Sequence, residues 1–159
     1  MSDGAIHGVL LTPLRQIVDE RGAVLHMMRS DAPGFLGFGE CYFSVINPGM
    51  MKAWKRHSRQ TQNLVVPVGG VRFVLCDTRE HSATRGALQT IELGRDLVFS
   101  RLTIPPLIWY GFACVGTTPA LVTNCADLAH EAGESETLPD GSFGDARALI
   151  ELQRGLKPP

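Results

Sequence analysis

Short strand-like segments separated by turn residues constrain this chain more than any other feature of its sequence. Apolar and polar residues alternate within short runs, and the runs end at glycine, proline, asparagine or aspartate. Because a period of two puts every second side chain on one face, this pattern is typical of an antiparallel sandwich or barrel. The expected strands cover residues 6–11, 14–18, 23–28, 40–46, 71–76, 88–93, 99–104, 108–115 and 120–125, with turns at 19–22 and 47–49. The sequence therefore predicts an all-β fold.

The composition fits a single domain over residues 1–159 and excludes several classes of function. Hydrophobic residues make up 44% of the chain and the net charge is −1, so there is no basic surplus for binding nucleic acid. The apolar runs have the length of strands, which is too short to cross a membrane as a helix. The first four residues do not resemble a signal sequence, so a cytoplasmic protein is expected. Helical spacing occurs only over residues 145–153, within a tail at about 140–159, which predicts a short C-terminal helix.

The stretch 49–69 holds the residues best suited to chemistry. Strand-like residues flank a polar turn, and Lys55 and His57 stand two positions apart. In a regular strand these two side chains share one face, while Trp54 and Arg56 share the other. Inside a barrel, the pair of polar side chains would face the cavity.

The same stretch resembles the first motif of the cupin superfamily, in which a glycine, two histidines, a glutamate and a closing glycine follow in order. These positions are occupied here by Gly49, Lys55, His57, Gln62 and Gly69. In metal-binding cupins the histidines and the glutamate are ligands, and the ligand histidine of the second motif falls on Tyr110. A lysine ammonium has no lone pair, and an amide is a poor ligand for a transition metal. We therefore expect a pocket without a metal or another cofactor.

The cysteines are isolated within apolar runs, at Cys41, Cys76, Cys114 and Cys125. This placement indicates buried free thiols in a reducing compartment. A disulfide framework or a metal site is the alternative.

Three segments around the cupin-like stretch narrow the family. They read Asp-Glu-Arg-Gly at 19–22, Asp-Thr-Arg-Glu-His-Ser-Ala-Thr-Arg-Gly at 77–86 and Ile-Pro-Pro-Leu-Ile-Trp-Tyr-Gly-Phe at 104–112. Their order and spacing, over residues 6–134, resemble the dTDP-4-dehydrorhamnose 3,5-epimerase family. The resemblance implies a metal-free jelly-roll homodimer of polysaccharide biosynthesis that acts on a nucleotide-linked 4-keto-6-deoxy sugar. In that family a base removes a proton beside the ketone, and an acid returns a proton to the opposite face of the enolate.

The resemblance also implies a set of substrate-binding residues. Arg21, Lys52 and Glu134 match the family and would supply a cation for the diphosphate and polar groups for the sugar and base. Two further candidates depart from the family pattern. His26 stands where the family has a glutamate, and Asn63 stands where it has a catalytic lysine.

Three residues are candidates for the chemistry itself. Lys55 stands at the position of the family's base histidine, and a lysine serves as a base when burial and neighbouring cations lower its pKa from about 10.4. The alternative role for Lys55 is phosphate binding or a place on the surface. His57 is the other candidate base or a nucleotide contact. The family's acid tyrosine falls on Thr123, so Tyr110 is the candidate acid, unless it is a core residue.

Two functions remain open from the sequence. The first is an epimerase-like isomerase that removes a proton next to the ketone of a nucleotide-linked sugar. The alternative is a non-catalytic sugar-nucleotide-binding cupin that has lost the acid–base residues. Polar residues at the base and pocket positions favour the enzyme. A homodimer is expected, because pairing would cover the edge strand predicted at 6–11.

Overall fold

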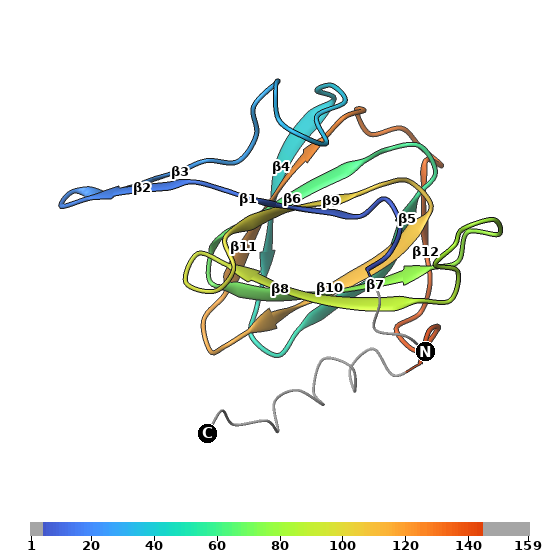
Figure 1. The fold of residues 1–159 in the computed structure, drawn as a ribbon. Coiled ribbons are helices and arrows are strands. Elements are labelled where there is room, and N and C mark those ends of the chain that lie inside the picture. The colour runs from blue at the N-terminus through green and yellow to red at the C-terminus, as the bar shows by residue number, and fades with distance from the viewer. Residues whose placement is uncertain (1–4, 145–159) are drawn as a thin grey trace.

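The computed structural model describes residues 5–144, and the regular elements of this part of the chain are all strands (Figure 1). They are β1 (Leu10–Pro13), β2 (Gln16–Asp19), β3 (Gly22–Leu25), β4 (Glu40–Ile46), β5 (Met51–His57), β6 (Gln62–Val68), β7 (Gly70–Asp77), β8 (Leu88–Gly94), β9 (Ser100–Ile104), β10 (Ile108–Val115), β11 (Ala120–Ala126) and β12 (Ser135–Thr137).

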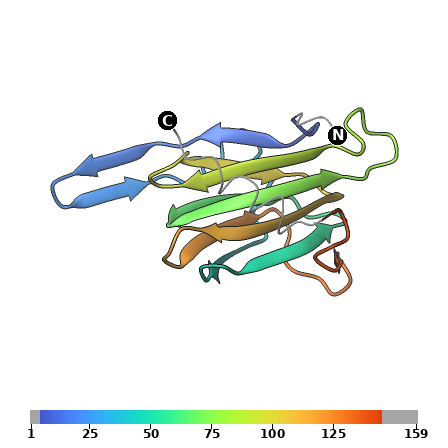
Figure 2. The same ribbon diagram turned by 90° about the horizontal axis from the view of Figure 1, so that it is seen from below.

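Two five-stranded antiparallel sheets enclose the core between them (Figures 1 and 2). One sheet has the strand order β1-β9-β6-β11-β4, and the other has the order β12-β5-β10-β7-β8. Strands β2 and β3 form a separate hairpin. This is the cupin-like jelly roll that the sequence predicts, so the expected fold class is confirmed.

The core follows from strand alternation in the two sheets. Phe73 and Leu75 of β7 belong to the main cluster, together with Leu64 and Leu102 from the facing sheet. A second, smaller cluster uses alternate residues of β7 and β10 together with one residue of β5, and it contains Trp54, Val74, Cys76, Trp109 and Ala113. Both tryptophans are therefore core residues, as the sequence indicates.

The predicted strand bounds hold best in the middle of the chain. β4 and β10 coincide with the predictions at 40–46 and 108–115, whereas the first strand begins four residues later than predicted, at Leu10. Ile6 does not belong to a strand. It is nevertheless buried in the core, and its backbone N–H donates to the Gln89 side chain at 2.9 Å. Pro13 ends β1 at a sheet edge, where its missing N–H breaks no ladder.

A bulge in β5 is the local feature that shapes the centre of the molecule. Tyr110 of β10 pairs with Lys55, but Phe112 pairs with Lys52, so two residues of β5 between these pairs oppose one residue of β10. The bulge brings Ala53 against Gly111, where an added Cβ would lie 2.5 Å from the Ala53 Cβ. Glycine at position 111 is therefore the residue that permits the bulge.

Replacing Gly111 with alanine is expected to destabilise the fold by about 1–3 kcal/mol, because the new methyl group must displace the bulged backbone. Thermal unfolding measures the effect. Gly141→Ala is the matched control, since an added Cβ there meets nothing within 4 Å. Equal melting temperatures for the two variants would contradict this account of the bulge.

The β2–β3 hairpin projects away from the barrel (Figure 1). Its turn is the predicted Asp-Glu-Arg-Gly segment, in which the Arg21 N–H donates to the Asp19 carboxylate at 2.8 Å. Gly22 closes the turn with φ of 143°, a conformation that suits glycine. The hairpin exposes apolar side chains along its length, namely Ile17, Val18 and Val24.

Three smaller expectations concern the tail, the membrane and the cysteines. Residues 140–144 form turns, and the helix expected over 145–153 lies outside the described residues. Within residues 5–144 there is no helix with the length and hydropathy of a membrane span.

The four cysteines are free, but Cys41 is exposed, because it lies on the edge strand β4 with its side chain away from the core.

Candidate active site

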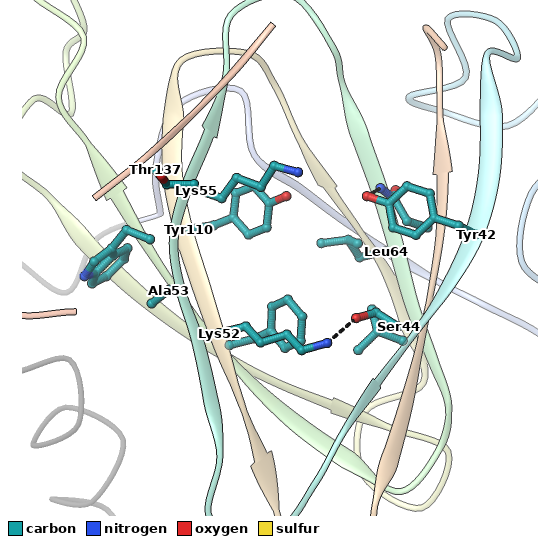
Figure 3. A pocket seen from close by; sticks show the side chains of 12 residues that line it. Tyr42, Ser44, Lys52, Ala53, Lys55, Leu64, Tyr110 and Thr137 are labelled. Atoms are coloured by element: carbon teal, nitrogen blue, oxygen red, sulfur yellow. Dashed lines mark hydrogen bonds between the residues drawn. The ribbon is translucent and has the colours of Figure 1, made fainter. Parts of the chain in front are cut away.

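A cavity of about 320 Å³ opens between the two sheets (Figure 3). Strands β5, β10 and β12 form one wall, and strands β4, β6 and β11 form the other. The lining residues are Tyr42, Ser44, Lys52, Ala53, Trp54, Lys55, Leu64, Tyr110, Phe112, Val122, Asn124 and Thr137.

Lys52 and Lys55 share the first wall, although regular alternation would place them on opposite faces of the strand. The bulge in β5 brings both side chains into the cavity, opposite Phe112 and Tyr110 respectively. None of the described residues that line the cavity carries a carboxylate. A pocket whose charged groups are two cations attracts anionic ligands and stabilises negative charge that develops within it.

Lys52 is exposed and spans the end of the cavity that we call its mouth. Its Nζ donates to the Ser44 hydroxyl at 2.8 Å and to the Val45 carbonyl at 2.9 Å, so it bridges the two walls (Figure 3). Both partners are neutral, which leaves the charge of Lys52 available to a ligand. Lys55 lies further along the same wall, beside Tyr110 (Figure 3).

His57 does not line the cavity; it lies behind Tyr110 as part of a buried pair with Glu134. The His57 Nδ1 is 2.6 Å from the Glu134 carboxylate, and both side chains are 3% exposed or less. The other carboxylate oxygen of Glu134 accepts hydrogen bonds from the backbone N–H groups of Arg59, at 3.0 Å, and Gln60, at 2.9 Å. Glu134 therefore holds His57 in place and does not line the cavity.

The charges of this pair follow from their surroundings. Burial alone would raise the pKa of Glu134, but the backbone N–H groups and the imidazole outweigh it and lower the pKa to about 2. Burial lowers the pKa of His57, against the opposing effect of Glu134. At neutral pH the ionised carboxylate can only accept, so His57 donates its Nδ1–H, and its Nε2 is an acceptor.

Tyr110 connects the buried pair to the cavity. Its hydroxyl lies 3.3 Å from the His57 Nε2, to which it donates, and it points into the cavity (Figure 3). Burial, followed by the neighbouring Tyr42 and Glu134, raises the pKa of Tyr110. The phenol is therefore protonated at neutral pH and forms the cavity end of a hydrogen-bonded chain that runs from Glu134 through His57.

Three predicted substrate-binding residues lie away from this cavity. Arg21 is at the tip of the projecting hairpin, paired with Asp19. His26 lines a separate cavity of about 180 Å³ beside Arg101. Asn63 is buried, and its Oδ1 accepts from the Thr103 hydroxyl at 2.7 Å, on the sheet face where Gly34 packs. The cavity therefore brings together Lys52, Lys55 and Tyr110, with His57 and Glu134 behind them.

The cupin ligand positions do not form a metal centre in the described part of the chain. Gln62 is buried, its amide donating to Gln60 at 2.7 Å and accepting from Asn124. Across residues 5–144, no three histidine, cysteine, aspartate or glutamate side chains gather as a metal site. The donor set of a lysine, a histidine, an amide and a phenol does not fit a transition metal.

The facing wall holds residues that the sequence analysis missed. Tyr42 and Ser44 of β4 line the cavity, and so does Asn124 of β11. The signal was present in the alternation of residues 40–46, where Tyr42 and Ser44 share a face with the buried Ile46. The inward face of a strand is usually apolar, so two polar side chains on that face indicate that the strand borders a cavity.

Comparisons with known proteins agree with this architecture. The chain is 53% identical to a dTDP sugar isomerase of Desulfovibrio desulfuricans G20, whose crystal structure matches with a TM-score of 0.84 over 87% of this chain and 88% of the other. It is 34% identical, over 121 residues, to a probable low-salt glycan biosynthesis epimerase, Agl13, of Haloferax volcanii, covering 75% of this chain and 77% of that protein.

A more distant structure shares the fold. The dTDP-4-dehydrorhamnose 3,5-epimerase of Elizabethkingia anophelis NUHP1 is 17% identical and has a TM-score of 0.75, over 91% of this chain and 82% of the other. No protein-family model matches the chain.

Proposed function

Because the chain belongs to the dTDP-4-dehydrorhamnose 3,5-epimerase family, we propose that it is an epimerase or isomerase of a nucleotide-linked 4-keto-6-deoxy sugar. The observation that carries this proposal is the cavity wall on which Lys55 stands beside Tyr110, with the phenol backed by the buried His57–Glu134 pair. A lysine base and a supported phenol are the groups needed to remove a proton next to a ketone.

Lys55 is the base in this proposal. Its side chain reaches the cavity from β5, whereas His57, the other candidate, is separated from the cavity by the Tyr110 hydroxyl. A general base must approach the carbon-bound proton to about hydrogen-bond distance. Of the two candidates, Lys55 therefore has the access that the reaction requires.

Tyr110 acts on the ketone oxygen. When the proton leaves the neighbouring carbon, its electron pair forms an enolate and negative charge develops on that oxygen. When substrate binds, the Tyr110 hydroxyl turns its single proton from the His57 Nε2 to this ketone oxygen, and Lys52 and the protonated Lys55 add positive charge to the same cavity. Before substrate binds, His57 and Glu134 hold the phenol in place through Nε2.

The nucleotide part of the substrate lies towards the mouth of the cavity, near Lys52. A lysine ammonium and an arginine fork are the common partners of a diphosphate. We place the sugar inside the cavity and the diphosphate at its rim. The free cysteines suit the reducing cytoplasm, in which we place the protein.

A second copy of the chain completes the substrate site in this proposal. The projecting hairpin exposes Val18 and Val24, at 64% and 60%, together with Arg21 at its tip. Apolar side chains on an unsupported hairpin are typical of an interface. Packed against a partner, the hairpin would present Arg21 to the mouth of that partner's cavity.

Charging the hairpin is expected to break the proposed homodimer. Val18 and Val24 lie on opposite faces of the hairpin in the β2–β3 register. Val18→Asp combined with Val24→Asp would therefore bury a carboxylate whichever apolar face meets the partner, so light scattering at micromolar concentration should change from dimer to monomer. Arg21→Ala should leave the dimer intact and weaken nucleotide binding about tenfold, through the loss of a charge-assisted hydrogen bond. A wild-type protein that is monomeric at this concentration would contradict the assignment.

The proposed reaction is tested by incubating the protein with dTDP-linked 4-keto-6-deoxyglucose in deuterated water. Deuterium should enter at a carbon beside the ketone, as followed by proton nuclear magnetic resonance. Binding of the nucleotide sugar without any exchange would favour the alternative, a binding protein that has lost the chemistry.

A further inference from the structure

Tyr42 stands on the wall of the cavity opposite Lys55 and Tyr110 (Figure 3). It belongs to β4, in the sheet that faces the one containing β5 and β10. The hydroxyl groups of Tyr42 and Tyr110 point towards each other across the space where a sugar ring would lie (Figure 3). Among the described residues that line the cavity, Tyr42 is the one ionisable group on this wall.

Inversion at a carbon needs groups on both walls. The base removes a proton from one face of the sugar, and the configuration changes only if a proton returns to the other face. Lys55 and Tyr110 come from adjacent paired strands and line the same wall of the cavity, so both would reach the same face of a bound sugar. From the stereochemistry and this geometry we infer that Tyr42 is the acid that protonates the opposite face, an assignment that rests on the function proposed above.

The hydrogen bonds of Tyr42 leave its own proton free for this step. The Asn124 amide Nδ2 donates to the Tyr42 oxygen at 2.9 Å, so the phenol is an acceptor in that contact. Its O–H remains available to the cavity. Burial raises the pKa of Tyr42, against the hydrogen bond from Asn124, which keeps the phenol protonated before the reaction.

The orientation of the Asn124 amide is fixed by its neighbours. The backbone N–H of Asn63 donates to the Asn124 Oδ1 at 3.1 Å, and an N–H can only donate. The NH₂ end of the amide is therefore directed to the Tyr42 oxygen and to the Gln62 Oε1. Asn124 thus acts as a positioning residue for Tyr42.

Strand β4, next to β11, supplies a tyrosine in place of the one that the family has on β11. The family's acid tyrosine falls on Thr123 of β11, which alternates with the cavity residues Val122 and Asn124 and so faces away from the cavity. Tyr42 pairs directly with Asn124 in the β4–β11 register. A phenol from the next strand therefore occupies the cavity beside β11.

The proton balance of the step is complete. Lys55 takes the proton from carbon, the electron pair returns from the enolate to the same carbon, and the Tyr42 O–H supplies the new proton. Lys55 ends as an ammonium and Tyr42 as a phenolate. Tyr42 is 37% exposed, so exchange with water restores both groups.

Tyr42→Phe separates this role from the rest of the reaction. With dTDP-linked 4-keto-6-deoxyglucose in deuterated water, the variant should still exchange the proton beside the ketone, within about tenfold of wild type, because Lys55 and Tyr110 are intact. Formation of the inverted sugar should fall by about 10²–10⁴-fold, the usual contribution of a general acid. Tyr110→Phe is the matched control and should slow exchange and inversion together.

The other outcomes distinguish this assignment from the proposed function. Inversion by Tyr42→Phe at a rate within threefold of wild type would overturn the role of Tyr42 alone. Equal loss of exchange and inversion, with nucleotide-sugar affinity and melting temperature unchanged, would also overturn it, since Tyr42 would then act before the proton is removed. Absence of exchange in the wild-type protein would overturn the proposed function and this assignment with it.

Discussion

Replacing Lys55 with alanine is expected to slow deuterium exchange beside the ketone by about 10²–10⁴-fold, the usual contribution of a general base. Among the described residues that line the cavity, no other side chain that could accept this proton stands on that wall beside Tyr110, since Lys52 is tied to Ser44 and Val45. The affinity for the nucleotide should change much less, because the base is expected to contact the sugar. Exchange followed by nuclear magnetic resonance, with affinity from calorimetry, measures both quantities.

Lys52→Ala is the matched control for Lys55→Ala, since the two lysines share one wall of the cavity. It should weaken binding while exchange at saturating substrate remains. His57→Gln should keep exchange at a reduced rate, because the phenol loses its support but the base remains. If exchange survives in Lys55→Ala and is lost only in His57→Gln, the role of base passes to the histidine.

Replacing Glu134 with glutamine is expected to remove about 3 kcal/mol of stability at pH 7, a value that follows from the shift of its pKa to about 2. An unfolded glutamate has a pKa of about 4.3. Because the folded pKa is lower, the ionised carboxylate stabilises the fold above about pH 4.3, and this stabilisation is lost as the pH falls towards 2. The two unfolding free energies should therefore converge at low pH.

Urea unfolding at several pH values between 7 and 3 measures this convergence. Asp77 is a second buried carboxylate whose pKa is lowered, against burial, by hydrogen bonds from Arg79 and nearby hydroxyls. It is present in both proteins, so its effect cancels in the difference. Glu131→Gln is the matched control, because Glu131 pairs with Arg59 while 65% exposed. A constant gap between wild type and Glu134→Gln at all pH values would contradict the assigned charge of Glu134.

The fold could be predicted from the sequence because most strands bury one face or both. Alternation and turn residues mark β4 and β10 to the residue, and the long apolar runs mark β7. The three-residue strand β12 could not be predicted, since its polar residues Ser135–Thr137 lie at a sheet edge and show no alternation with a core. The start of the first strand was misplaced because Ile6 is buried without belonging to a strand.

The site was partly predictable for a related reason. Lys55 and Tyr110 were identified from motif positions that do lie at the cavity. Lys52 and Lys55 share one face only because of the bulge in β5. A prediction that assumes strict alternation along a strand cannot detect such a change of register. Contact between His57 and Glu134 joins residues 77 positions apart, which requires the tertiary structure.

The strand β12 has a consequence for how the chain tolerates changes in length. Ser135 pairs with His57, so the residue before it, Glu134, arrives at the imidazole, and Thr137 arrives at the cavity. One residue inserted after β11 and before Glu134 can be absorbed as slack in the exposed loop 128–133. One residue inserted between Glu134 and Ser135 cannot be absorbed in this way. The pairing of Ser135 with His57 would no longer place the Glu134 carboxylate beside the imidazole. Natural and engineered length variation should therefore stop abruptly at position 134.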